Sequence, residues 1–211
     1  PLALQYAVYA LDLSLRAAHL DHTHGFVNGT SVFLRVLGQE DLPHEVDIRR
    51  PADPEAQTWR VATAMPELGA KRYGFGSYVA SNYDELIDHP VEMGDFALGT
   101  FKAHGVPHDI VITGRVPNLD MARLQADLKT LCETQVEFFE PRTKRAPMDR
   151  YVFMTMAVGD GYGGLEHRAS TALMAARMSN ATRRRCSCHG APPAARSRVC
   201  SRASRSETRA R

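Results

Sequence analysis

Residues 121–171 read MARLQADLKTLCETQVEFFEPRTKRAPMDRYVFMTMAVGDGYGGLEHRAST, and this stretch decides the fold. Its first part carries apolar residues at steps of three and four, the spacing of one face of an α-helix. These residues are Met121, Leu124, Leu128, Leu131, Cys132, Val136 and Phe139. Asn118 precedes the pattern as an N-cap, and Pro141 follows it. We therefore predict an amphipathic helix of about five turns, about 30 Å long, with Cys132 in the core.

The second part of this stretch begins with a continuous apolar run, Tyr151–Val158. A short run of this kind, bounded by a basic loop and by glycines, is typical of a strand that is buried on both faces. It is far shorter than the roughly 20 residues that a membrane-spanning helix requires. We therefore predict a buried strand after the helix and no membrane partner.

Upstream of the helix, apolar and polar residues alternate in short runs bounded by turn residues, which indicates β-strands. The runs are Leu4–Leu11, Ser31–Val36, His44–Arg49, Trp59–Met65, Asp95–Lys102 and His108–Thr113. Five or six strands at this spacing favour a sandwich or a saddle-like sheet. The sequence thus predicts an α+β fold. A β-rich N-terminal sandwich or saddle domain spans residues 1–116 with Trp59 in its core, and a second domain starts over residues 117–177.

The last part of the chain, residues 178–211, differs sharply in composition. It contains nine Arg and one Glu, a net charge of +8, although the whole chain carries only +2. Blocks of like charge are usually disordered. The segment lacks the Lys and aromatic residues common in nucleic-acid-binding arms, and its Cys186-Ser187-Cys188-His189 has no standard zinc spacing. We predict a disordered tail without a specific nucleic-acid partner, produced by a change of reading frame near Arg177.

Between the apolar strand and the tail, four glycines fall within six positions, at Gly159, Gly161, Gly163 and Gly164. Glycines permit sharp bends and the close approach of a ligand. One interpretation is a tight surface turn. Another is a dinucleotide fingerprint, because G-x-G-x-x-G follows a strand. We disfavour the fingerprint, since residues 165–167 look extended where a helix should open and no acid follows about twenty residues later.

The segment YGGLEHRAST, residues 162–171, resembles the glycyl aminopeptidase family, family 61 of the metallopeptidases. Residues 21–36, 83–94 and 105–110 resemble the same family, so the resemblance covers residues 1–177. It implies a thermolysin-like gluzincin with a β-rich N-terminal domain, usually followed by a PDZ domain. Residues 117–177 are then expected to form the first helix and strands of a thermolysin-like catalytic domain.

The resemblance also implies how these residues bind a peptide substrate. In such aminopeptidases a Gly-x-x-Glu segment on an edge strand aligns the peptide, and the Glu carboxylate binds its free α-amine through a charge-assisted contact. By resemblance this residue is Glu166, while Gly163 and Gly164 supply backbone for close approach. His167 is either a further substrate contact or a hydrogen-bonded structural histidine.

The metal site of the family has no counterpart in this sequence. Gluzincins hold zinc with H-E-x-x-H on a helix plus a later Glu, and the first Glu serves as general base. The chain contains no such motif; His44-Glu45 continues as Val46-Asp47-Ile48, and the pair His22 and His24 is not expected to bind metal. We therefore expect no catalytic residue, metal ligand or cofactor here. The chain is expected to be an inactive, truncated zinc aminopeptidase whose parent removes Gly or Ala.

Two residues outside the motif are candidates for supporting roles. Asp88-His89-Pro90 is predicted to form a turn in which the carboxylate caps backbone amides; alternatively, this loop approaches the active site of the family. Glu92 is a candidate support behind the site residues.

The chain begins with Pro1 and its first methionine is Met65, so we expect a removed leader or a start further upstream. Without a signal or membrane segment, the cytoplasm is favoured. The alternative to a peptidase is a non-enzymatic binding module whose basic tail contacts nucleic acid or a membrane.

Overall fold

The structure is a computed structural model that describes residues 2–177. These residues belong to one compact unit. The predictions made for the basic tail, namely its disorder, its origin out of frame and its contacts, concern residues 178–211 and lie outside the described residues. Within residues 2–177, no helix is both long and apolar enough to cross a membrane.

The N-terminal part of the unit consists of short strands. A four-stranded antiparallel sheet has the order β1-β2-β6-β4, formed by Ala18–Leu20, His24–Val27, Val91–Gly94 and Arg60–Ala62 respectively. A two-stranded sheet pairs β3 (His44–Ile48) with β5 (Gly76–Ala80). Short helical segments cover Gly29–Ser31, Pro54–Thr58 and α1, Tyr83–Ile87. The first turn of α1 is capped by Asn82, whose side chain accepts a hydrogen bond from the Glu85 backbone N–H at 2.7 Å.

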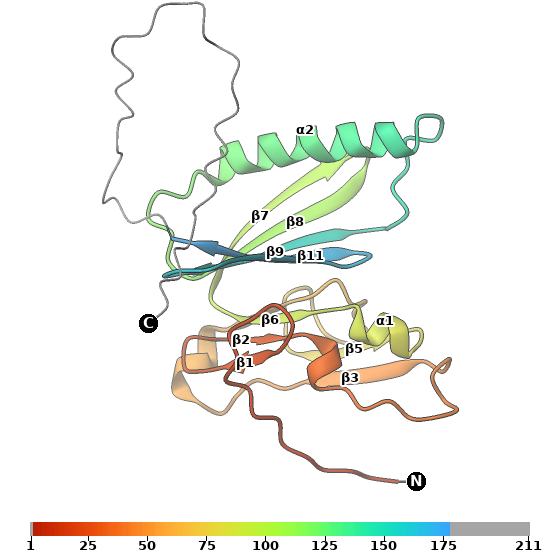
Figure 1. Ribbon diagram of the computed structural model, residues 1–211, viewed down its shortest axis with the longest axis vertical. Coiled ribbons are helices and arrows are strands. Elements are labelled where there is room, and N and C mark those ends of the chain that lie inside the picture. Colours follow the sequence, from red (N-terminus) through yellow and green to blue (C-terminus); the bar gives the residue numbers. More distant parts are fainter. Residues whose placement is uncertain (1, 178–211) are drawn as a thin grey trace, which may run out of the picture. The chain divides into compact units, whose positions relative to one another are not determined.

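The second part is a five-stranded sheet with one helix over it (Figure 1). The elements in chain order are β7 (Phe96–Ala103), β8 (Val106–Thr113), α2 (Met121–Phe139), β9 (Tyr151–Val158), β10 (Tyr162–Glu166) and β11 (Ser170–Ala176). Their order in the sheet is β10-β11-β9-β8-β7. β8, β9 and β11 run parallel, and the antiparallel strands β7 and β10 form the edges. α2 supplies the crossover that the parallel pair β8–β9 requires.

The predicted β-rich α+β fold is confirmed. Buried side chains of β9, Val152, Met154 and Met156, pack with Phe26 and Ala62 of the four-stranded sheet, so one part of the core lies between these two sheets. A further buried cluster around Met65, Tyr78 and Leu86 lies within the N-terminal part. Alternate residues of β9 are only partly buried on the side that α2 covers. The prediction that β9 is buried on both faces was therefore wrong for the face toward α2. The helix does not cover this face completely, and none of its own residues is fully buried.

Other predictions need correction in detail. The N-cap of α2 is Asp120, whose carboxylate accepts from the Arg123 backbone N–H at 3.0 Å, and not Asn118. Leu4–Leu11 and Ser31–Val36 are not strands. The first of these runs is extended with exposed side chains, and only Leu11 forms a bridge, to His19. Alternation alone was insufficient there because only the end of the run meets a neighbouring strand, β1.

The division into two domains after Val116 stays a prediction. The chain passes from the four-stranded to the five-stranded sheet between Gly94 and Phe96, so β7 and β8 already share a sheet with β9. Trp59 is buried, as predicted, with 4% of its surface exposed.

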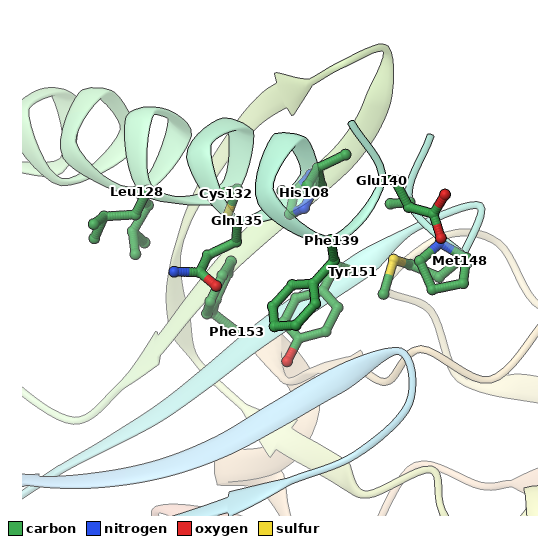
Figure 2. Close-up of a pocket in the computed structure, with 13 residues that line it drawn as sticks. His108, Leu128, Cys132, Gln135, Phe139, Glu140, Met148, Tyr151 and Phe153 are labelled. Atoms are coloured by element: carbon green, nitrogen blue, oxygen red, sulfur yellow. The ribbon is translucent and has the colours of Figure 1, made fainter. Parts of the chain in front are cut away.

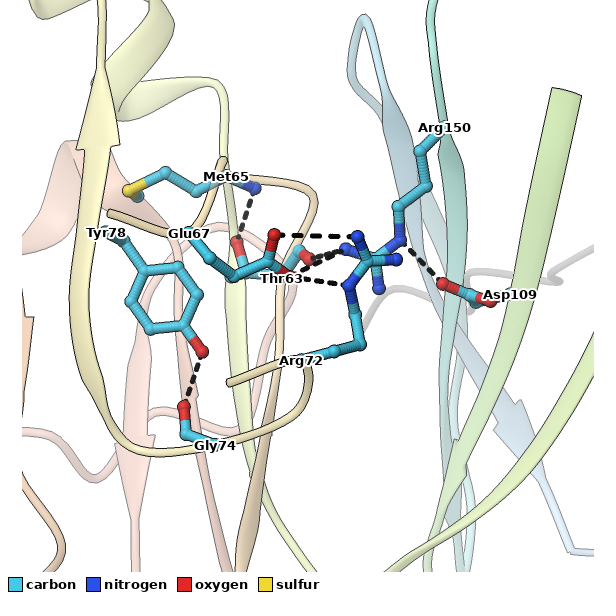
Figure 3. Close-up of polar contacts among 8 residues, drawn as sticks. All are labelled: Thr63, Met65, Glu67, Arg72, Gly74, Tyr78, Asp109 and Arg150. Atoms are coloured by element: carbon cyan, nitrogen blue, oxygen red, sulfur yellow. Dashed lines mark hydrogen bonds and ion pairs between the residues drawn. The ribbon is translucent and has the colours of Figure 1, made fainter. Parts of the chain in front are cut away.

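Arg150 connects the five-stranded sheet to the loop after β4 (Figure 3). Its Nε donates to Asp109 Oδ2 at 2.6 Å, and its Nη1 donates to the Thr63 carbonyl at 3.1 Å. Nη1 also lies 3.7 Å from Glu67 Oε1, and Glu67 pairs in turn with Arg72 at 2.6 Å. Because the side chains of Arg150 and Asp109 are mostly buried, this cluster fixes the loop against β8.

Candidate functional site

The glycine-rich segment forms a turn and then an edge strand. Gly159 and Gly161 lie in the turn between β9 and β10, and Gly161 has φ +152. A Cβ at Gly161 would lie 2.8 Å from Met174 Sδ, so a side chain there would require the Met174 side chain to move. A strand follows the turn where the dinucleotide fingerprint requires a helix. That interpretation is therefore wrong, and the extended conformation expected near Leu165 is confirmed.

Glu166 ends β10 with an exposed side chain. Side chains of a strand alternate between its two faces, and here Tyr162, Gly164 and Glu166 are exposed while Gly163 and Leu165 are half-buried. Leu165 packs on the buried cluster of the inter-sheet core. A Cβ at Gly164 would lie 3.8 Å from Glu166 Oε1. The missing side chain thus leaves space beside the carboxylate.

His167 and Asp88 meet although 79 positions separate them in the chain. Asp88 is the C-cap of α1, and its Oδ1 lies 3.2 Å from His167 Nδ1. Its Oδ2 accepts from the Arg168 backbone N–H at 2.9 Å. The predicted capping of a backbone amide by Asp88 is therefore found, but the amide belongs to the β10–β11 turn. His167 is hydrogen-bonded to Asp88, and its role as a substrate contact stays a prediction.

These residues share a polar cavity of about 460 Å³. It is lined by Glu166, His167 and Arg168 from the hairpin, by Asp84 and Asp88 from α1 and its cap, and by Arg16, Asn28 and Thr30 from the N-terminal sheet region. Gly163 and Gly164 do not line it; they lie earlier on the same edge strand. The cavity therefore collects Glu166 and His167, but not the whole predicted set.

Glu92 does not support Glu166. It is buried on β6, with 1% of its surface exposed, and its Oε1 lies 3.0 Å from His24 Nδ1. Burial raises the pKa of Glu92, and His24 offsets part of this effect. Burial opposes the charge on His24, but the hydrogen bond and charge of Glu92 prevail and raise the pKa of His24. Glu92 thus pairs β6 with β2, and the expectation that it lies behind the site residues was wrong.

The described residues contain no metal-binding cluster. Across residues 2–177, no group of three or more His, Cys, Asp and Glu side chains is arranged to hold a metal ion. His24 is committed to Glu92, and His22 is exposed. His44 and Glu45 lie on β3, where they do not form the helical pair of a zinc motif.

His89, next to Asp88, should make stability depend on pH. Burial lowers the pKa of His89 from its ordinary value of 6.5, although Glu85 and Asp88 offset part of the effect. The unfolded chain then binds a proton more readily than the folded chain, so the free energy of unfolding falls as the pH drops below that value. We expect urea titrations between about pH 7.5 and about pH 5.5 to show a smaller decrease for His89→Gln than for the unmodified protein.

His22→Gln is the control for this experiment, because His22 is exposed. Burial also lowers the pKa of His108, which contributes to the decrease in both proteins and cancels in their difference. Equal decreases for His89→Gln and the unmodified protein would contradict the expectation.

An apolar cavity lies elsewhere, between α2 and the sheet (Figure 2), with a volume of about 610 Å³. Leu128, Cys132 and Phe139 of α2 face Tyr151 and Phe153 of β9 across it. Cys132 is therefore half-buried beside a cavity and does not lie in a packed core as predicted. Burial raises the pKa of Tyr151 to about 12, so this phenol is neutral at physiological pH. Charged side chains are gathered around Glu166 instead.

Comparison with known proteins tests the resemblance. Residues 1–95 match the family model of the Peptidase M61 N-terminal domain. The resemblance to the peptidase M61 family is confirmed. A solved structure described as an aminopeptidase N family protein from Idiomarina loihiensis is 49% identical, with a TM-score of 0.75. The match covers 81% of this chain and 28% of that one, so the M61-like chain spans little more than a quarter of its neighbour's length. No curated protein sequence matches.

The M61 resemblance brought Glu166 and His167 to attention, but other residues around the cavity were missed or misjudged. For Asp88 the sequence left open a local turn or a loop near the active site, and it did not predict that both carboxylate oxygens bind the β10–β11 hairpin. Arg16 was not singled out at all. Its position in a turn before β1 carries no motif, and only the pairing of sheets places it beside Glu166.

Proposed function

We propose that residues 2–177 form the part of an M61-type aminopeptidase that receives the N-terminus of a peptide, with Glu166 holding the free α-amine. The observation that carries the proposal is the position of Glu166 at the end of edge strand β10. Its exposed carboxylate has no hydrogen-bond or ion-pair partner among residues 2–177. A carboxylate in this position can form a charge-assisted hydrogen bond with a protonated amine.

The outer edge of β10 supports the same proposal. Within the described part of the chain, β10 pairs only with β11. An exposed strand edge offers N–H and C=O groups to an extended peptide, and this type of pairing gives affinity independent of side chains. Gly163 and Gly164 have no side chains that would obstruct a peptide lying along this edge. The peptide would then run along β10 with its amine at Glu166.

Zinc is the metal that the M61 resemblance implies, and the residues present do not fit it. The 211 residues contain no H-E-x-x-H, and the side chains of residues 2–177 do not converge on a metal position. We therefore propose that this chain binds peptide N-termini without hydrolysing them. Hydrolysis of N-terminal Gly or Ala belongs to our proposal for the larger parent protein.

The experiment is a calorimetric or NMR titration of the full chain with Ala-Ala amide and with its N-acetylated form. Acetylation removes the positive charge that Glu166 is proposed to bind. We expect the free amine to bind about tenfold more tightly, which corresponds to about 1.4 kcal/mol. The variant Glu166→Gln should bind both peptides equally weakly.

Glu45→Gln is the matched control. Glu45 is exposed on a strand, as Glu166 is, but it belongs to β3. It should keep the preference for the free amine. Equal affinity of the unmodified chain for the free and acetylated peptides, or a preference that survives in Glu166→Gln, would refute the proposal.

A further inference from the structure

The charged groups around Glu166 divide into those that are already bound and those that are not. Asp88 uses both its oxygens, one for His167 and one for the Arg168 backbone N–H. In contrast, the side chains of Glu166, Asp84, Arg16 and Arg168 make no hydrogen bond or ion pair within residues 2–177. The cavity therefore presents two carboxylates and two guanidinium groups that are free to bind a ligand.

His167 gives a second, independent indication of a ligand. Its side chain is only 6% exposed, and Nε2 is buried without a hydrogen-bond partner among the described residues. Nδ1 lies 3.2 Å from Asp88 Oδ1, and in the tautomer that carries its proton on Nδ1 the other nitrogen, Nε2, is an acceptor. A buried acceptor without a donor is costly. His167 lines the cavity, so a rotation of its ring would bring Nε2 to a donor of the ligand.

We infer that this cavity binds a ligand that carries both an amine and a carboxylate, with the carboxylate held by Arg16 and Arg168. The inference rests on the proposed function, which places the amine at Glu166. Arg16 lies in the turn before β1 and Arg168 in the β10–β11 turn, so two separate elements bring their guanidinium groups to the same cavity. Guanidinium groups bind carboxylates through paired, charge-assisted hydrogen bonds.

The size of the cavity and its unpaired groups of both charge signs fit a small zwitterion. Its volume of about 460 Å³ lies within the range of small-molecule sites, about 300–1,000 Å³. When an amine binds Glu166, the guanidinium groups of Arg16 and Arg168 still lack a hydrogen-bond or ion-pair partner among residues 2–177, so they can accept a carboxylate of the ligand. Two ligands have the required chemistry: a dipeptide with a free C-terminal carboxylate, and a longer peptide whose first residue is acidic. Both place a carboxylate within a few bonds of the α-amine.

Three peptides distinguish these sources in titrations of the full chain. Ala-Ala amide carries only the amine, Ala-Ala adds the C-terminal carboxylate, and Asp-Ala amide adds a side-chain carboxylate. We expect at least one of the two carboxylate peptides to bind about tenfold more tightly than Ala-Ala amide. Whichever peptide binds more tightly identifies the source of the carboxylate. Arg16→Gln and Arg168→Gln should each reduce this preference severalfold, measured against the affinity of the same variant for Ala-Ala amide.

Arg123→Gln is the control, since Arg123 is exposed on α2 and far from the cavity in sequence and contacts. It should keep the carboxylate preference. If all three peptides bind equally and acetylation still weakens binding, this inference is refuted while the proposed function stands. A carboxylate preference that persists in both arginine variants also refutes it. If acetylation has no effect, the proposed function fails, and the amine half of this inference fails with it.

Discussion

Replacing Arg150 with alanine is expected to destabilise the protein by about 3 kcal/mol, because the change leaves a buried carboxylate without its partner. Asp109 is almost fully buried, and Arg150 is its ion-pair partner at 2.6 Å. The same change removes the hydrogen bond to the Thr63 carbonyl. Urea unfolding followed by circular dichroism should show a lower midpoint with an unchanged slope.

Arg49→Ala provides the matched control for this prediction. Arg49 pairs with Asp47 at a similar distance, 2.7 Å, but 86% of its side chain is exposed. Exposed pairs contribute little, so we expect a change of less than about 1 kcal/mol. The double variant Arg150→Met/Asp109→Leu should lose less than Arg150→Ala, since no buried charge is left unpaired. Equal effects of Arg150→Ala and Arg49→Ala would contradict the importance of burial.

The substitution Gly114→Ala should destabilise the protein by about 3 kcal/mol through two separate effects. Gly114 follows β8 with φ +93, a backbone conformation that side chains rarely tolerate. A Cβ there would also lie 2.5 Å from the Ala157 carbonyl oxygen, which belongs to the backbone of β9 and cannot rotate away. The unfolding midpoint in urea measures the combined cost.

Gly105→Ala separates the two effects. Gly105 has a similar φ, +84, but a Cβ at that position would meet no atom within 4 Å. We expect this control to cost only about 1 kcal/mol, the strain alone. A result in which both alanine variants lose the same stability would show that the close approach to Ala157 is relieved by a small backbone shift.

The sequence predicted those elements whose apolar pattern extends over many consecutive residues. The apolar steps from Met121 to Phe139 and the run Tyr151–Val158 correspond closely to α2 and β9. In contrast, β1, β2 and β6 have three or four residues each and were not predicted. So few residues carry too little periodicity, and these strands are held by partners far away in the chain, as when β2 pairs with β6.

The candidate site shows the same limit. The edge position of Glu166 agrees with what the family resemblance implied, because the local motif specifies a strand after a glycine turn. The contact of Asp88 with His167 could not be derived, since it depends on how α1 is placed against the β10–β11 hairpin. The cavity likewise combines residues as distant as Arg16 and Arg168, which no local pattern connects.

The strand order of the five-stranded sheet has a consequence for synthesis on the ribosome. β11 is made after β10 but occupies the place between β10 and β9. Until Ala176 has been translated, β9 has one edge without its neighbour, and β10 has no strand to pair with. At about 5–20 residues per second, this nascent sheet remains incomplete for on the order of a second or more after β9 is made. Cotranslational folding of the sheet must therefore wait for β11, and chaperones that protect open strand edges would act in that interval.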